Sequence, residues 1–75
     1  MRSVREIARD VEKDWVKVSP YAQPYLDAMF MIDSINDDYY ADSAKSVVLY
    51  FLANAKGWKG EKAKKIKAEL NAMCK

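Results

Sequence analysis

Apolar residues recur every three or four positions in four successive stretches of this chain, and no other feature constrains its fold as strongly. In the first stretch, Ser3 and Glu6 form the S-x-x-E pattern of a capping box at a helix N-terminus. The apolar residues that follow lie on one helical stripe: Val4, Ile7, Ala8, Val11, Trp15 and Val18. We therefore predict a helix over about residues 4–17, with ion pairs such as Asp10 with Lys13 on its opposite face.

A second helix is predicted over about residues 20–35. Ser19 and Pro20 favour its start, because serine caps helices well and proline is tolerated in the first turn. Pro24 lacks an N–H, and its ring presses on the carbonyl four residues back. We therefore expect an irregular turn over residues 20–23 before the regular helix begins near Pro24.

This second segment is apolar nearly all round. One face carries Tyr21, Tyr25, Ala28, Met29, Ile32 and Ile35. Leu26, Phe30 and Met31 point away from that face. A helix with so little polar surface is typical of the centre of a bundle or of an interface.

The third helix is predicted over about residues 43–55, and we expect it at the centre of the core. Before it, Asn36, Asp37 and Asp38 favour a turn because their side chains compete for backbone hydrogen bonds. Asp42 or a neighbour is the expected cap. The clean apolar face consists of Ala44, Val47, Val48, Phe51, Leu52 and Ala55, with further apolar surface behind it from Leu49, Tyr50 and Ala53.

The fourth helix is predicted over about residues 61–73. Gly57 suits the left-handed position just past a helix end, and Gly60 opens the next helix. Trp58, between the two glycines, is expected to fill the core between the third and fourth helices. The inner stripe of the last helix is Ala63, Ile66, Leu70 and Met73.

Composition agrees with one all-α domain over residues 1–75, a compact bundle of about four short helices. Apolar residues make up 51% of the chain, which has only two glycines and two prolines, so a folded helical chain is favoured over a linker. The single cysteine, Cys74, excludes an internal disulfide and favours a reducing compartment. With no signal-peptide core and no apolar span of membrane length, we expect a cytoplasmic protein that does not enter a membrane.

The sequence has few of the residue types and motifs that catalysis requires. Histidine is absent, so the sequence has no ordinary general base near neutral pH, no Ser-His or Cys-His nucleophile and no imidazole metal ligand. The carboxylates that begin at Asp33 do not fit a calcium loop, because its twelfth position falls on Ala44 instead of a glutamate. Glycine-rich phosphate loops are also missing. We expect no catalytic residue, metal or cofactor, and no enzyme activity.

The charges are divided along the chain, which bears on binding. Residues 18–44 hold five aspartates and no lysine or arginine, whereas residues 56–75 hold seven lysines and two glutamates. Aromatic and soft side chains beside carboxylates are typical of protein interfaces. We predict a partner-binding surface, or alternatively a homodimer contact, formed by Phe30, Met31, Asp37, Asp38, Tyr39, Tyr40 and Asp42. The other interpretation is that Tyr39 and Tyr40 close the bundle over the turn.

A nucleic-acid-binding module is the alternative function. The segment 57–60 joins two predicted helices, as in a helix-turn-helix, and the last helix is rich in lysine. Lysines contact phosphate but hardly select sequence, because bases are usually read by arginine, asparagine or glutamine. The residues that would bind nucleic acid are Lys59, Lys62, Lys64 and Lys65.

Three runs of the sequence resemble small uncharacterised all-helical proteins of bacterial phages and other mobile elements. These runs are residues 19–29 (SPYAQPYLDAM), 43–48 (SAKSVV) and 57–63 (GWKGEKA), and the likeness covers nearly the whole chain. The resemblance transfers no site residues. It implies a context, since small proteins of such elements often act by occupying a larger host or element-encoded protein, including defence nucleases.

Overall fold

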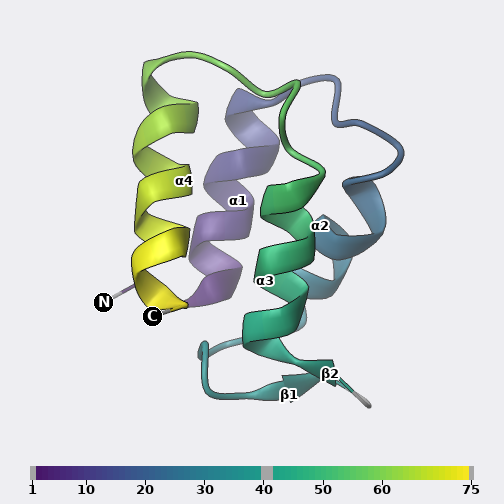
Figure 1. Cartoon of the computed structure of the whole chain (residues 1–75), viewed down its shortest axis with the longest axis vertical. Coiled ribbons are helices and arrows are strands. Elements are labelled where there is room, and N and C mark those ends of the chain that lie inside the picture. Colours follow the sequence, from purple (N-terminus) through teal and green to yellow (C-terminus); the bar gives the residue numbers. More distant parts are fainter. Residues whose placement is uncertain (1, 40–41, 75) are drawn as a thin grey trace.

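The computed structural model describes residues 2–39 and 42–74 as an all-α bundle. Its four helices are α1 (Val4–Asp14), α2 (Gln23–Met29), α3 (Ala44–Ala53) and α4 (Glu61–Met73). Two-residue strands, β1 (Asp38–Tyr39) and β2 (Asp42–Ser43), pair antiparallel between α2 and α3. In Figure 1, α3 lies between α4 and α2, α1 packs behind, and the strand pair lies beyond the start of α3. The predicted fold class is confirmed.

Helix α1 begins as the sequence predicts and ends early. The Ser3 hydroxyl accepts a hydrogen bond from the Glu6 N–H (3.1 Å), and the Glu6 carboxylate accepts one from the Ser3 N–H, which completes the capping box. The helix ends at Asp14 instead of residue 17, because the backbone of Trp15 turns out of the helical region to φ −94° and ψ 84°. This turn lets the Trp15 side chain reach the core, where it is buried.

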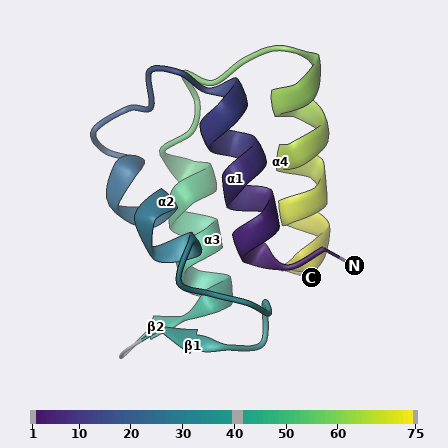
Figure 2. The same ribbon diagram turned by 180° about the vertical axis from the view of Figure 1, so that it is seen from behind.

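The predicted ion pair between Asp10 and Lys13 on α1 is wrong. Asp10 pairs with Arg2, eight residues earlier in the sequence, and not with Lys13. Arg2 also donates hydrogen bonds from Nη2 to Glu69 Oε1 (2.6 Å) and from Nε to Glu69 Oε2 (3.1 Å). One guanidinium thus joins the start of α1 to the last turns of α4. Figure 2 shows the start of α1 and the end of α4 lying near each other.

Helix α2 is much shorter than the predicted 20–35. The irregular turn before it is confirmed, with the Ser19 carbonyl accepting from the N–H groups of Ala22 (3.0 Å) and Gln23 (2.9 Å). The helix stops at Met29 because the chain beyond it is bound to α1. The Phe30 carbonyl accepts from Arg5 Nε (3.1 Å), and the Asp33 carbonyl accepts from the Val4 N–H (2.9 Å).

The apolar face assigned to α2 also needs correction. Leu26, predicted to point away, is fully buried in the core, whereas Tyr21, predicted on the inner face, is 77% exposed. Ala28, Met29 and Ile32 of the predicted face are buried as expected, and Ala22 and Leu26 complete the core side of this segment. A nearly all-apolar segment gives no polar face from which to fix its rotation.

Helices α3 and α4 agree closely with the prediction. The side chain of Ser43 caps α3 by accepting from the Ser46 N–H (3.1 Å). Helix α4 has the predicted bounds, and its inner stripe is buried as expected. Gly57 does not adopt the predicted left-handed conformation, since the glycine with positive φ is Gly60 at 117°, the N-cap of α4.

Trp58 lies in the core, as predicted, and is 2% exposed. Its ring stacks on that of Trp15, with centroids 5.8 Å apart and planes within 8° of parallel. Trp15 and Phe51 on α3 pack edge to face, with ring centroids 6.2 Å apart. These rings join the end of α1, helix α3 and the α3–α4 connection into one core.

No helix in residues 2–39 and 42–74 combines the length and apolar character needed to traverse a bilayer.

Candidate functional site

Asp37, one of the predicted partner-binding residues, shapes the turn in which it lies. Its side-chain oxygen Oδ2 accepts from the N–H groups of Asp33 (3.2 Å) and Ser34 (3.0 Å), and its own N–H bonds the Ser34 carbonyl (2.9 Å). The Asp37 carbonyl then accepts from the Ala44 N–H (2.8 Å). The residue is exposed, but its carboxylate already has two backbone partners.

The next predicted residues form the strand pair. Asp38 is exposed and pairs with Ser43, and Tyr39 pairs with Asp42. The structure describes the backbone of Tyr39 and Asp42 but not their side chains, and Tyr40 lies outside the described residues. A strand pair in place of a simple turn was not predicted, because two-residue strands leave no alternation to detect in the sequence.

Phe30 and Met31 separate into different environments at the end of α2. Phe30 is partly buried against the core, whereas Met31 is 68% exposed. Within the predicted surface, the side chains of Met31 and Asp38 are exposed to solvent and make no hydrogen bond or ion pair with the described residues.

A second surface, which we call the α3 face, consists of Leu49, Tyr50 and Ala53. Leu49 is 48% exposed, Tyr50 is 53% exposed, and Ala53 is also exposed. The ring of Tyr50 stacks on that of Tyr25 from α2, with centroids 5.5 Å apart. The sequence showed these residues as apolar surface behind the main stripe, but only the packing of the other helices reveals that about half of each of the Leu49 and Tyr50 side chains stays exposed.

The lysines predicted to contact nucleic acid, Lys59, Lys62, Lys64 and Lys65, are all exposed. Lys67 differs, because its Nζ donates to the Trp58 carbonyl (2.5 Å) and lies 5.7 Å from the centre of the Trp58 ring. Burial, and secondarily the charge of Lys59, lowers the pKa of Lys67. Trp58 itself is enclosed in the core and so offers no platform on which a base could stack.

No protein-family model, curated protein or solved structure gives a significant match to this chain. The resemblance to proteins of mobile elements therefore stays a prediction. A role for the protein has to be argued from its surfaces.

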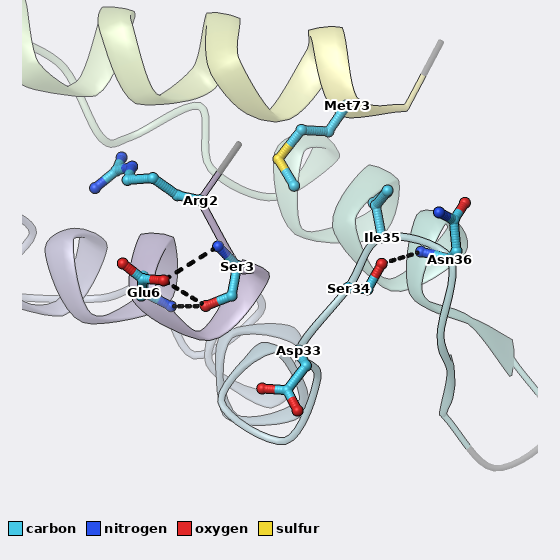
Figure 3. A pocket seen from close by; sticks show the side chains of 8 residues that line it. All are labelled: Arg2, Ser3, Glu6, Asp33, Ser34, Ile35, Asn36 and Met73. Carbon is cyan, nitrogen blue, oxygen red and sulfur yellow. Dashed lines mark hydrogen bonds between the residues drawn. The ribbon is translucent and has the colours of Figure 1, made fainter.

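A depression with a volume of about 340 Å³ lies between the start of α1, the loop after α2 and the end of α4 (Figure 3). Its lining residues are Arg2, Ser3, Glu6, Asp33, Ser34, Ile35, Asn36 and Met73. The charged groups here are engaged with other residues: Arg2 with Asp10 and Glu69, Glu6 with Ser3, and Asp33 with Arg5 (3.0 Å). The depression thus offers Ile35 and Met73 as apolar contacts beside charges that are already paired.

A smaller depression, of about 260 Å³, lies where the loop after α3 enters α4. It is lined by Trp58, Lys59, Gly60, Ala63, Lys64 and Lys67. Three of these six residues are lysines, so the local potential is positive. Within the described part of the chain, carboxylate and thiol groups form no cluster that would hold a metal ion.

Proposed function

We propose that this chain is a small protein-binding domain, adaptor-like or inhibitor-like, and that the α3 face is its main contact surface. The observation that carries the proposal is the exposure of Leu49 and Tyr50 in the middle of α3. No charged residue occurs in the sequence between Lys45 and Lys56. The outer face of a helix in a small bundle is normally polar, so an exposed apolar stripe of this kind is typical of an interaction site.

The Tyr50 ring is also held in place before any partner arrives. Its stacking on Tyr25 restricts the rotation of an otherwise exposed side chain. Tyrosines that need little further ordering contribute strongly to binding, because less conformational entropy is lost on association. Tyr50 is therefore the expected centre of the contact, with Leu49 and Ala53 beside it.

The acidic strand pair is proposed as a second contact region. Asp38 is exposed there, Met31 is exposed just after α2, and Tyr39, Tyr40 and Asp42 stay predicted members of the surface. The resemblance to proteins of mobile elements supports a larger host protein in the cytoplasm, such as a defence nuclease, as the partner. Nucleic-acid binding remains the second candidate function, because Lys59, Lys62, Lys64 and Lys65 all face solvent.

The test is capture of proteins from host-cell extract by the immobilised domain, followed by mass spectrometry and by binding measurements with the purified partner. The double variant Leu49→Ala, Tyr50→Ala should weaken binding by about thirtyfold or more, since residues central to an interface each contribute about 2 kcal/mol or more. Val16→Ala is the matched control, because Val16 is an apolar residue that is 82% exposed outside the α3 face.

Circular dichroism must show that the double variant is folded. A partner that binds the double variant as tightly as the unmodified domain would reject the α3 face. Loss of the same partner in Met31→Ala, Asp38→Asn would then assign the contact to the acidic strand pair.

A further inference from the structure

We infer that the partner segment that docks on the α3 face is an acidic amphipathic helix of another protein. This inference rests on the proposed function and names the chemistry of its partner. It depends on the charges that surround the apolar centre of the face, which favour an acidic partner and oppose a second copy of this chain.

Cations border the α3 face at both ends. Lys45 lies in the first turn of α3, and Lys56 follows its last turn; both are exposed. They are eleven positions apart in the sequence, and the helical part from Lys45 to Ala53 rises about 12 Å at about 1.5 Å per residue. Leu49, Tyr50 and Ala53 lie between the two charges.

Further cations come from the side of α4 that lies against α3. Lys67 and Cys74 are seven residues apart and so share one face of α4. Lys67 contacts Trp58, just after α3, and the Cys74 thiol approaches the Lys45 carbonyl (3.9 Å). Lys64 lines the same depression as Lys67. Positive charge thus gathers beside Trp58, two residues after Lys56, at the C-terminal end of the α3 face.

Carboxylates that would neutralise these lysines are few in this half of the chain. From residue 43 to residue 75 the sequence has eight lysines and two acids, Glu61 and Glu69. At the Lys45 end, the exposed Asp38 of the strand pair lies opposite Ser43, the N-cap of α3, so the excess of positive charge is greatest toward Lys56 and α4. Glu69 is bound to Arg2 on the α1 side of the bundle, so it does not serve the α3 face. The face therefore attracts a partner that carries apolar residues together with negative charge.

A second copy of this chain does not fit the same face. A symmetric contact presents the same patch from both molecules. If two α3 helices cross antiparallel about the midpoint of residues 49–53, each Lys45 approaches Lys56 of the second copy. Apolar contact would then be opposed by repulsion between like charges at both ends of the helix pair.

An acidic amphipathic helix matches both the apolar stripe of the α3 face and the lysines that border it. Apolar residues spaced by three, four and seven positions would cover Leu49, Tyr50 and Ala53, and Asp or Glu side chains on the flanks would reach the lysines. About two helical turns match the rise from Lys45 to Ala53. Nucleic acid lacks the apolar component, and its phosphates would lose water over Leu49 and Tyr50 without a polar partner.

The probe for this inference is a fluorescein-labelled synthetic peptide of about 18 residues with leucine on one helical face and glutamate on the other. Fluorescence anisotropy compares it with a peptide in which every glutamate is lysine, and with a scrambled peptide of the same composition. We expect binding of the glutamate peptide only, weakened by added salt because the flanking ion pairs are exposed.

Variants then locate the site. Lys45→Gln, Lys56→Gln should weaken binding of the glutamate peptide about tenfold, the sum of two exposed ion pairs. The control variant Lys62→Gln, Lys65→Gln also removes two positive charges, but from α4. It should change the affinity for the glutamate peptide less than twofold, since Lys62 lies toward Asp10 of α1. Leu49→Ala, Tyr50→Ala should abolish it.

The inference would be overturned by equal binding of the glutamate and lysine peptides, by binding that survives the Leu49 and Tyr50 variant, or by no binding of the glutamate peptide at all. Light scattering at two concentrations tests the second copy, because a dimer that Leu49→Ala, Tyr50→Ala disperses would show that the face serves self-association. A DNA duplex that displaces the peptide would likewise contradict it. The proposed function can hold even if this inference fails, since a captured host protein can bind through Leu49 and Tyr50 without presenting an acidic helix.

Discussion

Replacement of Trp58 tests whether one side chain fastens the α3–α4 connection to α1. Trp58 is almost completely buried and stacks on Trp15, and its Nε1 donates a hydrogen bond to Asp14 Oδ2 (2.8 Å). Lys67 covers the ring from α4. Trp58→Ala would therefore remove contacts to both the end of α1 and α4.

The expected cost is large relative to the stability of so small a domain. Truncation of a buried tryptophan to alanine lowers the free energy of unfolding by about 3–5 kcal/mol. A domain of 75 residues has a total of about 4–11 kcal/mol, from roughly 0.05–0.15 kcal/mol per residue. Trp58→Ala should therefore remove about a third or more of the stability, and at the low end of that range the domain would not fold.

Trp58→Phe separates packing from hydrogen bonding. It keeps an apolar ring in the core but loses the N–H that Asp14 accepts, so we expect a smaller loss of about 1–2 kcal/mol. A double-mutant cycle with Asp14→Ala should give a coupling of about 0.5–1.5 kcal/mol for the bond between the two side chains.

The assay is urea unfolding followed by far-ultraviolet circular dichroism, because tryptophan fluorescence changes with the substitution itself. Tyr21→Ala is the matched control, since it removes an aromatic ring that is largely in solvent and should change stability by less than about 0.5 kcal/mol. If Trp58→Ala lost no more stability than Tyr21→Ala, the assignment of Trp58 as the residue that fastens this connection would be wrong.

Two further predictions concern titratable groups. Hydrogen bonding from Arg2 holds the pKa of Asp10 below its ordinary value of 3.8, so the pair stabilises the fold fully above that pH and is lost as pH falls below it. Asp10→Asn should be less stable than the unmodified domain by a few tenths to about 1 kcal/mol at pH 6 or so, with the gap closing near pH 2 in urea titrations; a gap independent of pH would refute the pairing. Burial raises the pKa of the Cys74 thiol, so iodoacetamide near pH 8 should alkylate the folded protein more slowly than the urea-unfolded chain, and equal rates would contradict that burial.

Helix α4 was predictable because its local signals agree. A glycine precedes it, and Ala63, Ile66, Leu70 and Met73 recur at helical spacing against a lysine-rich outer face. Polar and apolar residues alternate with one period, so both the bounds and the rotation of the helix follow from the sequence. The capping box that starts α1 is local in the same way.

Helix α2 was not predictable in the same detail, because long-range contacts end it. The Phe30 carbonyl receives its hydrogen bond from Arg5, and the Asp33 carbonyl receives one from Val4, both on α1. Nothing near residue 30 in the sequence indicates these donors. With apolar residues on every side, the segment also gave no polar stripe to show that Leu26 faces the core and Tyr21 faces solvent.

The candidate site shows the same division between local and distant information. The apolar character of Leu49 and Tyr50 is visible in the sequence, but their exposure depends on where α2 and α4 pack against α3. The turn at Asp37 was foreseen, whereas the two backbone N–H groups that its carboxylate accepts from were not. Residue type therefore indicated what each group can contact, and tertiary packing decided which of them remain available.

Several carboxylates of this protein are paired inside the fold whereas the exposed lysines of α4 are not, and this difference favours an acidic partner. Several carboxylates of the first half already have internal partners: Asp10 pairs with Arg2, Asp33 with Arg5, and Asp14 accepts from Trp58. The lysines of α4 that face solvent, by contrast, make no ion pair among the described residues. The formal net charge of +2 therefore understates the positive potential on the α3–α4 side of the molecule. A partner approaching that side meets uncompensated cations around an apolar stripe, and the rate of association should fall as salt screens them while the apolar contact persists.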